Sequence, residues 1–143
     1  MKKDTELRSE RDLDLYAAYV RAVEELDFET EAEAADHARR MTAPRFYVGE
    51  KFCAEVMSRM EKGLPPEGGN SLSRLKFMAL YALYMEELPT ALERGETRFD
   101  VCRRIVEMPA PSFYISKRSA MNIIRREKRK RADCVARTYG RRR

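Results

Sequence analysis

The side chains best suited to binding a ligand lie in a basic segment near the C-terminus. Arg118, Asn122, Arg125 and Arg129 are spaced by four, three and four residues, which places them on one face of a helix, whereas Ile124 faces elsewhere and can pack. Arginine can pair with guanine, and asparagine with adenine, in the major groove of DNA. The same arginines can neutralise phosphates without reading sequence. The segment therefore predicts a helix with a cationic, nucleic-acid-binding face.

The positive charge of the chain is concentrated in its last 32 residues. Residues 112–143 hold 12 Lys and Arg against 2 Asp and Glu, a net charge of +10, whereas the whole chain carries +5. The first 111 residues are therefore mildly acidic. The final stretch, 132–143, predicts a basic tail that lies along a nucleic-acid backbone or enters a minor groove. A solubilising disordered tail is the alternative.

An internal repeat organises the chain. APRFYV at 43–48 recurs as APSFYI at 110–115, an offset of 67, and LYAAYVRAVEEL at 15–26 matches FMALYALYMEEL at 77–88, an offset of 62. The difference implies five extra residues in the second copy, which fit the segment PTALERGE. Self-similarity over such a distance predicts two tandem copies of one structural unit.

The first helix of each copy is predicted from its apolar pattern. In copy one, Leu13, Tyr16, Val20 and Val23 follow the three-and-four rhythm of an amphipathic helix. Its counterpart at 72–88 is apolar nearly all round, which predicts the central buried helix of the chain or a contact between copies of the protein. The residues expected to be largely buried there are Leu75, Met78, Ala79, Ala82, Leu83 and Met85.

The second helix of each copy begins at a threonine followed three residues later by an acid. Thr30 precedes Glu33 and Thr97 precedes Asp100, the pattern in which a hydroxyl and a carboxylate cap the first turn. Each helix must end before the prolines of the APxFY motif, because proline disfavours the helical conformation in the residue before it. Both copies therefore predict a short capped helix followed by an extended link.

The link and the third helix complete each unit. We expect the link aromatics to fill the junction between helices: Phe46, Tyr47, Phe113 and Tyr114. Base stacking is the other role open to them. The third helix should start after the link, with Ser116 as a good N-cap in copy two and Gly49 as a tolerable one in copy one.

Composition agrees with a helical, soluble protein. The chain is 43% hydrophobic and 37% charged, with only 6 Gly and 6 Pro, which favours solvated helices over sheets with many turns. We therefore predict an all-α fold of two packed three-helix repeats. The expected segments are 1–62 for the first repeat, 63–70 for the linker, 71–131 for the second repeat and 132–143 for the basic tail.

The second unit, whose third helix is capped by Ser116 and continues KRSAMNIIRRE, resembles the trihelical helix-turn-helix group of DNA-binding domains over residues 97–131. Residues 30–62 are a degenerate copy. The resemblance implies that the third helix of copy two is the recognition helix, with Tyr114, Ser116 and Lys117 as phosphate contacts. The PAPSFY link is longer than the tight turn of that group, which leaves the helix crossing angle open. The matching face in copy one contains Glu55, which phosphate would repel.

We therefore expect a nucleic-acid-binding accessory or regulatory protein that acts on duplex DNA rather than RNA. Arg126, Lys130 and Arg131 are further candidate contacts in the basic sequence. The alternative is a helical protein-interaction or assembly module, which could form a homo-oligomer, with a basic tail for an acidic partner.

No other class of function is predicted from the sequence. It has no phosphate-binding glycine loop and no residue set arranged for catalysis, so we expect neither an enzyme nor a cofactor. Cys53, Cys102 and Cys134 are too widely spaced for a metal site and are interpreted as reduced, small apolar residues. The N-terminus lacks the apolar stretch of a signal peptide, and no apolar run is long enough to span a bilayer. A cytoplasmic protein is predicted.

Overall fold

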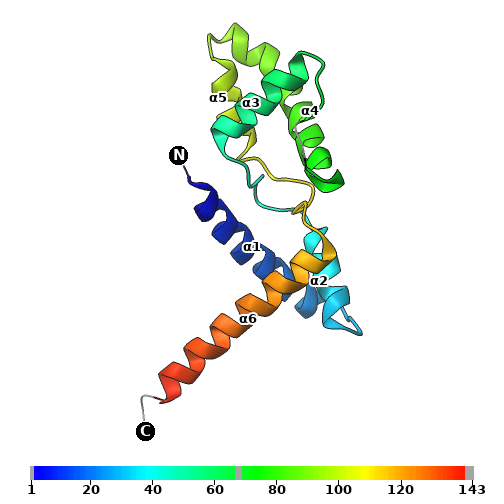
Figure 1. Ribbon diagram of the computed structural model, residues 1–143, viewed down its shortest axis with the longest axis vertical. Helices are drawn as coiled ribbons and strands as arrows, with labels where there is room; N and C mark the ends of the chain where they lie inside the picture. The colour runs from blue at the N-terminus through cyan, green and yellow to red at the C-terminus, as the bar shows by residue number, and fades with distance from the viewer. Residues whose placement is uncertain (1, 67–68, 141–143) are drawn as a thin grey trace.

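The protein is built of α-helices, as the sequence predicts. A computed structural model describes residues 2–66 and 69–140, and within them six helices and no β-strand are present (Figure 1). The helices are α1 (Asp4–Glu25), α2 (Glu31–Arg39), α3 (Glu50–Glu61), α4 (Ser71–Glu93), α5 (Arg98–Ile105) and α6 (Lys117–Gly140).

The predicted caps set the starts of three helices. The Thr30 hydroxyl accepts a hydrogen bond from the amide of Glu33, and Thr97 and Asp100 form a complete capping box at the start of α5. Ser116 accepts from the amide of Ser119 at the start of α6. Each cap satisfies an amide that the first helical turn leaves without a partner.

The two APxFY links cross and pair with each other. Ala43 donates its amide proton to the carbonyl of Ala110, and Ala110 donates to the carbonyl of Ala43, both at 2.9 Å. This is the reciprocal bonding of an isolated antiparallel β-bridge. Ala43 and Ala110 are both buried and 67 positions apart, so the predicted repeat places equivalent residues opposite each other.

A second pair of hydrogen bonds ties each link to the end of a helix in the other copy. Phe46 donates to the carbonyl of Val106, and Phe113 donates to the carbonyl of Arg39, both at 3.0 Å. The donors are 67 positions apart, and so are the acceptors. Because neither extended link has a backbone–backbone hydrogen bond within itself in the described structure, these cross-link bonds satisfy backbone groups that would otherwise be buried without partners.

The link aromatics stack across the same crossing. Phe46 stacks on Tyr114 and Tyr47 on Phe113, with ring centroids 6.3 and 6.1 Å apart. Both phenylalanines are buried, so these rings fill the junction. The backbones of the links differ at the tyrosines, since Tyr114 has a φ of 54° whereas Tyr47 does not have a positive φ.

The third helix of each copy packs on the other half of the chain. In the described part of the molecule, α6 contacts α1 and α2, whereas α3 contacts α4 and α5. Figure 1 shows the two groups at opposite ends, joined by the crossing links. The segments expected from the sequence, 1–62 and 71–131, group each third helix with the two helices before it. The packing differs because an extended link, unlike a tight turn, carries the helix past its own unit. Buried residues of both groups and both links form one continuous core.

The apolar face predicted for α1 is wrong in part, since only Tyr16 and Val20 of its four residues pack against the core. Leu13 and Val23 are exposed, and Tyr16 and Val20 are only partly buried. The buried residues lie on another face: Leu7, Leu15, Ala18, Tyr19 and Ala22. That face includes small alanines, which allow α2 and α6 to approach closely, whereas the prediction gave most weight to large residues.

The prediction that α4 is buried nearly all round is also wrong. Leu75, Met78, Ala82 and Met85 are exposed, and Ala79 and Leu83 are partly buried. The buried face consists of Phe77, Leu80, Tyr84, Leu88 and Ala91. The helix packs on α3 and α5, and Ala79, Tyr81 and Leu83 are partly buried against the same core.

The extra residues of the second copy lengthen α4. The helix runs through Pro89 to Glu93, beyond the end expected near Leu88. The segment PTALERGE therefore begins as additional helix and becomes a turn only at Arg94 and Gly95.

The core of α4 gives a test of this packing. Leu80 is fully buried and Met78 is exposed on the same helix. Leu80→Ala should reduce the free energy of unfolding by ~2 to 5 kcal/mol, because it leaves a cavity. Met78→Ala should change it by less than about 0.5 kcal/mol. Urea unfolding of the two variants measures both values, and similar losses in the two would contradict the assigned faces.

Candidate nucleic-acid interface

Helix α6 is apolar on the side that packs and cationic on the opposite side. Ala120, Met121, Ile123 and Ile124 are buried on the side that contacts α1 and α2. The predicted stripe is exposed throughout: Arg118, Asn122, Arg125 and Arg129. The expected orientation of the helix is therefore confirmed.

One member of the stripe, Arg125, has an acidic neighbour. The Arg125 Nε lies 3.5 Å from Glu31 Oε1, with the arginine side chain 62% exposed. An ion pair this exposed contributes little free energy to stability. Arg125 can therefore exchange the carboxylate for a phosphate at little cost. Arg118 and Arg129 form no ion pair with any side chain that the structure describes.

Two other cations of α6 hold the helix on its neighbours. Arg126 pairs with Asp12 of α1 at 2.5 Å, and Asp12 is only 8% exposed. Lys128 contacts Glu31 of α2 at 2.6 Å and donates to the Tyr19 hydroxyl at 2.9 Å. Arg126, a predicted nucleic-acid contact, is thus engaged in docking α6. The docking role of Lys128 was not predicted, because its partners are 97 and 109 residues away.

The candidates Lys130 and Arg131 surround a buried acid. Glu127 is 3% exposed, and its carboxylate lies 3.3 Å from Lys130 Nζ and 3.2 Å from Arg131 Nη1. The Arg131 guanidinium also lies 3.9 Å from the ring centroid of Tyr16. Both cations remain exposed, but part of their charge compensates Glu127.

The three candidates at the start of α6 have different environments. Ser116 is occupied as the N-cap, and Tyr114 is partly buried against Phe46, where burial raises the pKa of its hydroxyl. Lys117 is exposed at the first position of α6. The positive end of the helix dipole there favours an anion, so Lys117 extends the cationic face toward the N-terminus of α6.

The helix continues through most of the segment expected to form a separate tail. The tail was expected to start at residue 132, whereas α6 runs to Gly140, and residues 141–143 lie outside the described part of the chain. Figure 1 shows the C-terminal turns of α6 projecting away from the rest of the molecule. A long projecting helix can enter a groove without interference from α1 and α2.

The equivalent face of α3 is exposed but nearly neutral. Lys51, Glu55, Ser58 and Lys62 are all exposed. These residues lie 67 positions before the stripe of α6 and so correspond to it in the repeat. Because they combine two cations with an acid, the face lacks the strong positive charge of the stripe. It therefore offers an internal control for experiments on α6.

Comparison of the chain with protein-family models, with curated proteins and with solved structures gives no match. Among the described residues, no helix has both the length and the hydrophobicity needed to cross a bilayer.

The contacts of Glu31 predict that docking of α6 is sensitive to acid. The hydrogen bond from Lys128 lowers the pKa of Glu31 below its ordinary value of 4.5. A lowered carboxyl pKa stabilises the folded state above the unfolded-state pKa, and this stabilisation is lost as pH falls through the folded-state value. Glu31→Gln should therefore lower the free energy of unfolding at about pH 7, and the difference from the parent should shrink at about pH 3.

Denaturant unfolding at the two pH values measures this difference. The exposed Glu24 serves as the matched control, and Glu24→Gln should have little effect at either pH. A Glu31→Gln deficit that is unchanged by acid would contradict a charge-dependent contact.

Proposed function

We propose that this protein binds duplex nucleic acid, DNA rather than RNA, through the exposed face of α6, as an accessory or regulatory factor. The observation that carries the proposal is the separation of charges on this helix. Arg126 and Lys128 are used in docking, whereas Arg118 and Arg129 point away from the core and have no acidic partner in the described structure.

The face is suited to both parts of DNA recognition. Arg118, Arg125 and Arg129 can bind phosphates or donate paired hydrogen bonds to guanine, and Asn122 can bind adenine. The opposite side of α6 is fixed by a packed core, so the contact residues are held on a rigid element. This arrangement supports insertion of α6 into the major groove.

The proposal includes an architecture in which two copies of one three-helix unit exchange their third helices. It is supported by the reciprocal hydrogen bonds of the links, in which donors and acceptors both recur at an offset of 67. Under this architecture α3 and α6 are equivalent helices that have diverged in charge, and only α6 has kept or acquired a cationic face.

Removing the three arginines of the stripe tests the function. Arg118→Ala, Arg125→Ala and Arg129→Ala together should leave the fold intact, because all three side chains are exposed. Binding to duplex DNA should weaken, and the slope of log affinity against log salt concentration should flatten by ~2 to 3 units, since each phosphate contact contributes about 0.9. Fluorescence anisotropy titrations over a range of salt concentrations give this slope.

The matched control is the equivalent face of α3. Lys51→Ala with Lys62→Ala should alter the slope much less, because Glu55 already opposes phosphate binding there. Parent-like DNA affinity of the α6 triple variant at every salt concentration would rule out the α6 interface.

A second candidate function, helical protein assembly, is favoured by one observation on α4. The exposed side of this helix carries apolar residues at alternating spacings of three and four, which is the heptad pattern of a coiled-coil seam. These residues are Leu75, Met78, Ala82, Met85, Pro89 and Leu92.

If this seam pairs two copies of the chain, sedimentation should show a dimer that the double substitution Met78→Glu with Met85→Glu converts to a monomer. A parent that is monomeric at all concentrations would exclude self-assembly through α4.

A further inference from the structure

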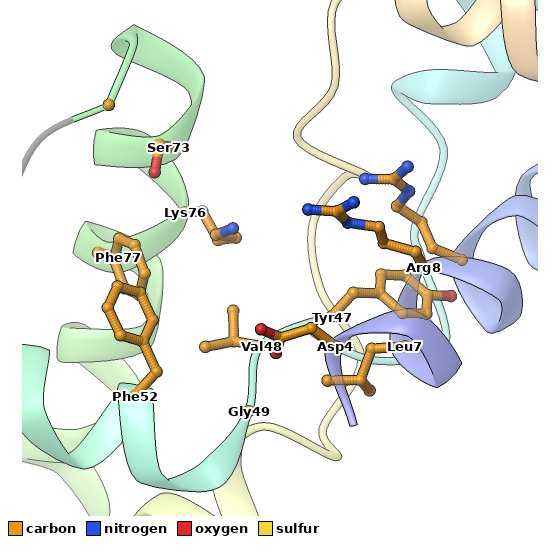
Figure 2. A pocket seen from close by; sticks show the side chains of 12 residues that line it. Asp4, Leu7, Arg8, Tyr47, Val48, Gly49, Phe52, Ser73, Lys76 and Phe77 are labelled. Carbon is orange, nitrogen blue, oxygen red and sulfur yellow. The ribbon is translucent and has the colours of Figure 1, made fainter. Parts of the chain in front are cut away.

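A pocket of about 490 Å³ lies where the two helix groups meet. One wall comes from α1, another from the N-terminal part of α4, and the first link and the start of α3 close the base (Figure 2). Its volume is within the range of about 300 to 1,000 Å³ typical of small-molecule sites. The pocket is separate from the exposed face of α6, since no residue of α6 lines it.

Three cations line one part of this pocket. Arg8 and Arg11 of α1 both line the pocket. Figure 2 shows Lys76 of α4 extending toward the side that carries Arg8. Arg11 pairs with Asp12 at 3.1 Å, whereas Arg8 and Lys76 form no ion pair with any side chain in the described residues. Burial, together with the charge of Arg11, lowers the pKa of Lys76. The positive charges are therefore only partly compensated.

The acidic lining residue lies apart from these cations. Asp4 is directed toward Val48 and the start of α3 (Figure 2), and its Oδ1 would lie 3.8 Å from a Cβ placed on Gly49. The carboxylate is thus near the free amides at the N-terminus of α3, which favour negative charge. This separation leaves the space between Arg8, Arg11 and Lys76 electropositive.

An aromatic surface adjoins the cationic part. Phe52 of α3 and Phe77 of α4 meet edge to face, with ring centroids 5.7 Å apart, and Lys76 Nζ lies 5.1 Å from the Phe77 centroid. Phe52 is exposed despite its size, because it borders the pocket rather than the core. Such a surface can cover a flat apolar ring whose charged substituent reaches the cations.

We propose that this pocket binds a small organic anion, with a phosphate or carboxylate group between Arg8, Arg11 and Lys76 and a planar apolar body against Phe52, whose ring packs on the buried Phe77. The anion compensates the charge that the protein leaves unpaired. Because α1 belongs to one helix group and α3 and α4 to the other, the bound molecule bridges the two groups. This site is independent of the proposed nucleic-acid interface.

Titration of the full chain with simple probes tests the site. Phenyl phosphate and benzoate supply a ring with each head group, whereas inorganic phosphate and phenol each lack one half of the proposed ligand. At least one of phenyl phosphate and benzoate should give saturable shifts in the amide NMR signals of Gly49 and Lys76. The anion that binds more tightly identifies the preferred head group. The two half-probes should bind at least about tenfold more weakly. Equal binding of inorganic phosphate and phenyl phosphate, or no saturable shift with either anion, would overturn the proposal.

Two variants separate binding from folding. Lys76→Met should raise the thermal midpoint in anion-free buffer, because it removes a partly buried, unpaired charge, yet it should weaken binding of the preferred anion at least about tenfold. Arg8→Gln, at an exposed position, should weaken binding without an effect on folding. Arg21→Gln, an exposed arginine of the same helix that does not line the pocket, should bind like the parent. Parent-like binding by both Lys76→Met and Arg8→Gln would overturn the assignment.

Discussion

The mutual pairing of the two APxFY links is the constraint on which the rest of the fold depends. An extended link through the centre of a small protein has backbone amides and carbonyls that neither water nor a helix can satisfy. Here each link supplies the partners of the other, through Ala43 with Ala110 and through the amides of Phe46 and Phe113. The links must cross to do so, and each third helix is consequently placed on the opposite group of helices.

The way α6 is attached to α1 and α2 determines which of its cations remain available. An apolar stripe and a few charged contacts, Arg126 with Asp12 and Lys128 with Glu31, attach one side of the helix to α1 and α2. Since these contacts use only part of the basic sequence, the outward stripe keeps its charge. Helix α3 has the equivalent relation to its own group but carries Glu55 at the outward face. The outward faces of α3 and α6 therefore differ in charge.

Local features of the fold could be predicted from the sequence, and long-range packing could not. The threonine caps, the helix-ending prolines, the buried link phenylalanines and the outward stripe of α6 depend on a few neighbouring residues, and the structure confirms them. The buried face of α1 was missed because it includes Ala18 and Ala22, whereas the predicted face was chosen from large apolar residues. The partners of Arg125 and Lys128 lie nearly a hundred residues away, and the anion pocket combines α1, the first link, α3 and α4. No local pattern predicts which distant segments meet.

Methyl-resolved NMR of the full chain can show directly whether the crossing links exchange the third helices. Val56 of α3 and Ile123 of α6 are equivalent buried positions, 67 residues apart. If the helices are exchanged, the Ile123 methyl groups should show nuclear Overhauser effects to α1 and α2, and the Val56 methyl groups should show them to α4 and α5. Effects from Ile123 to α4 and α5, with Val56 facing α1 and α2, would contradict it.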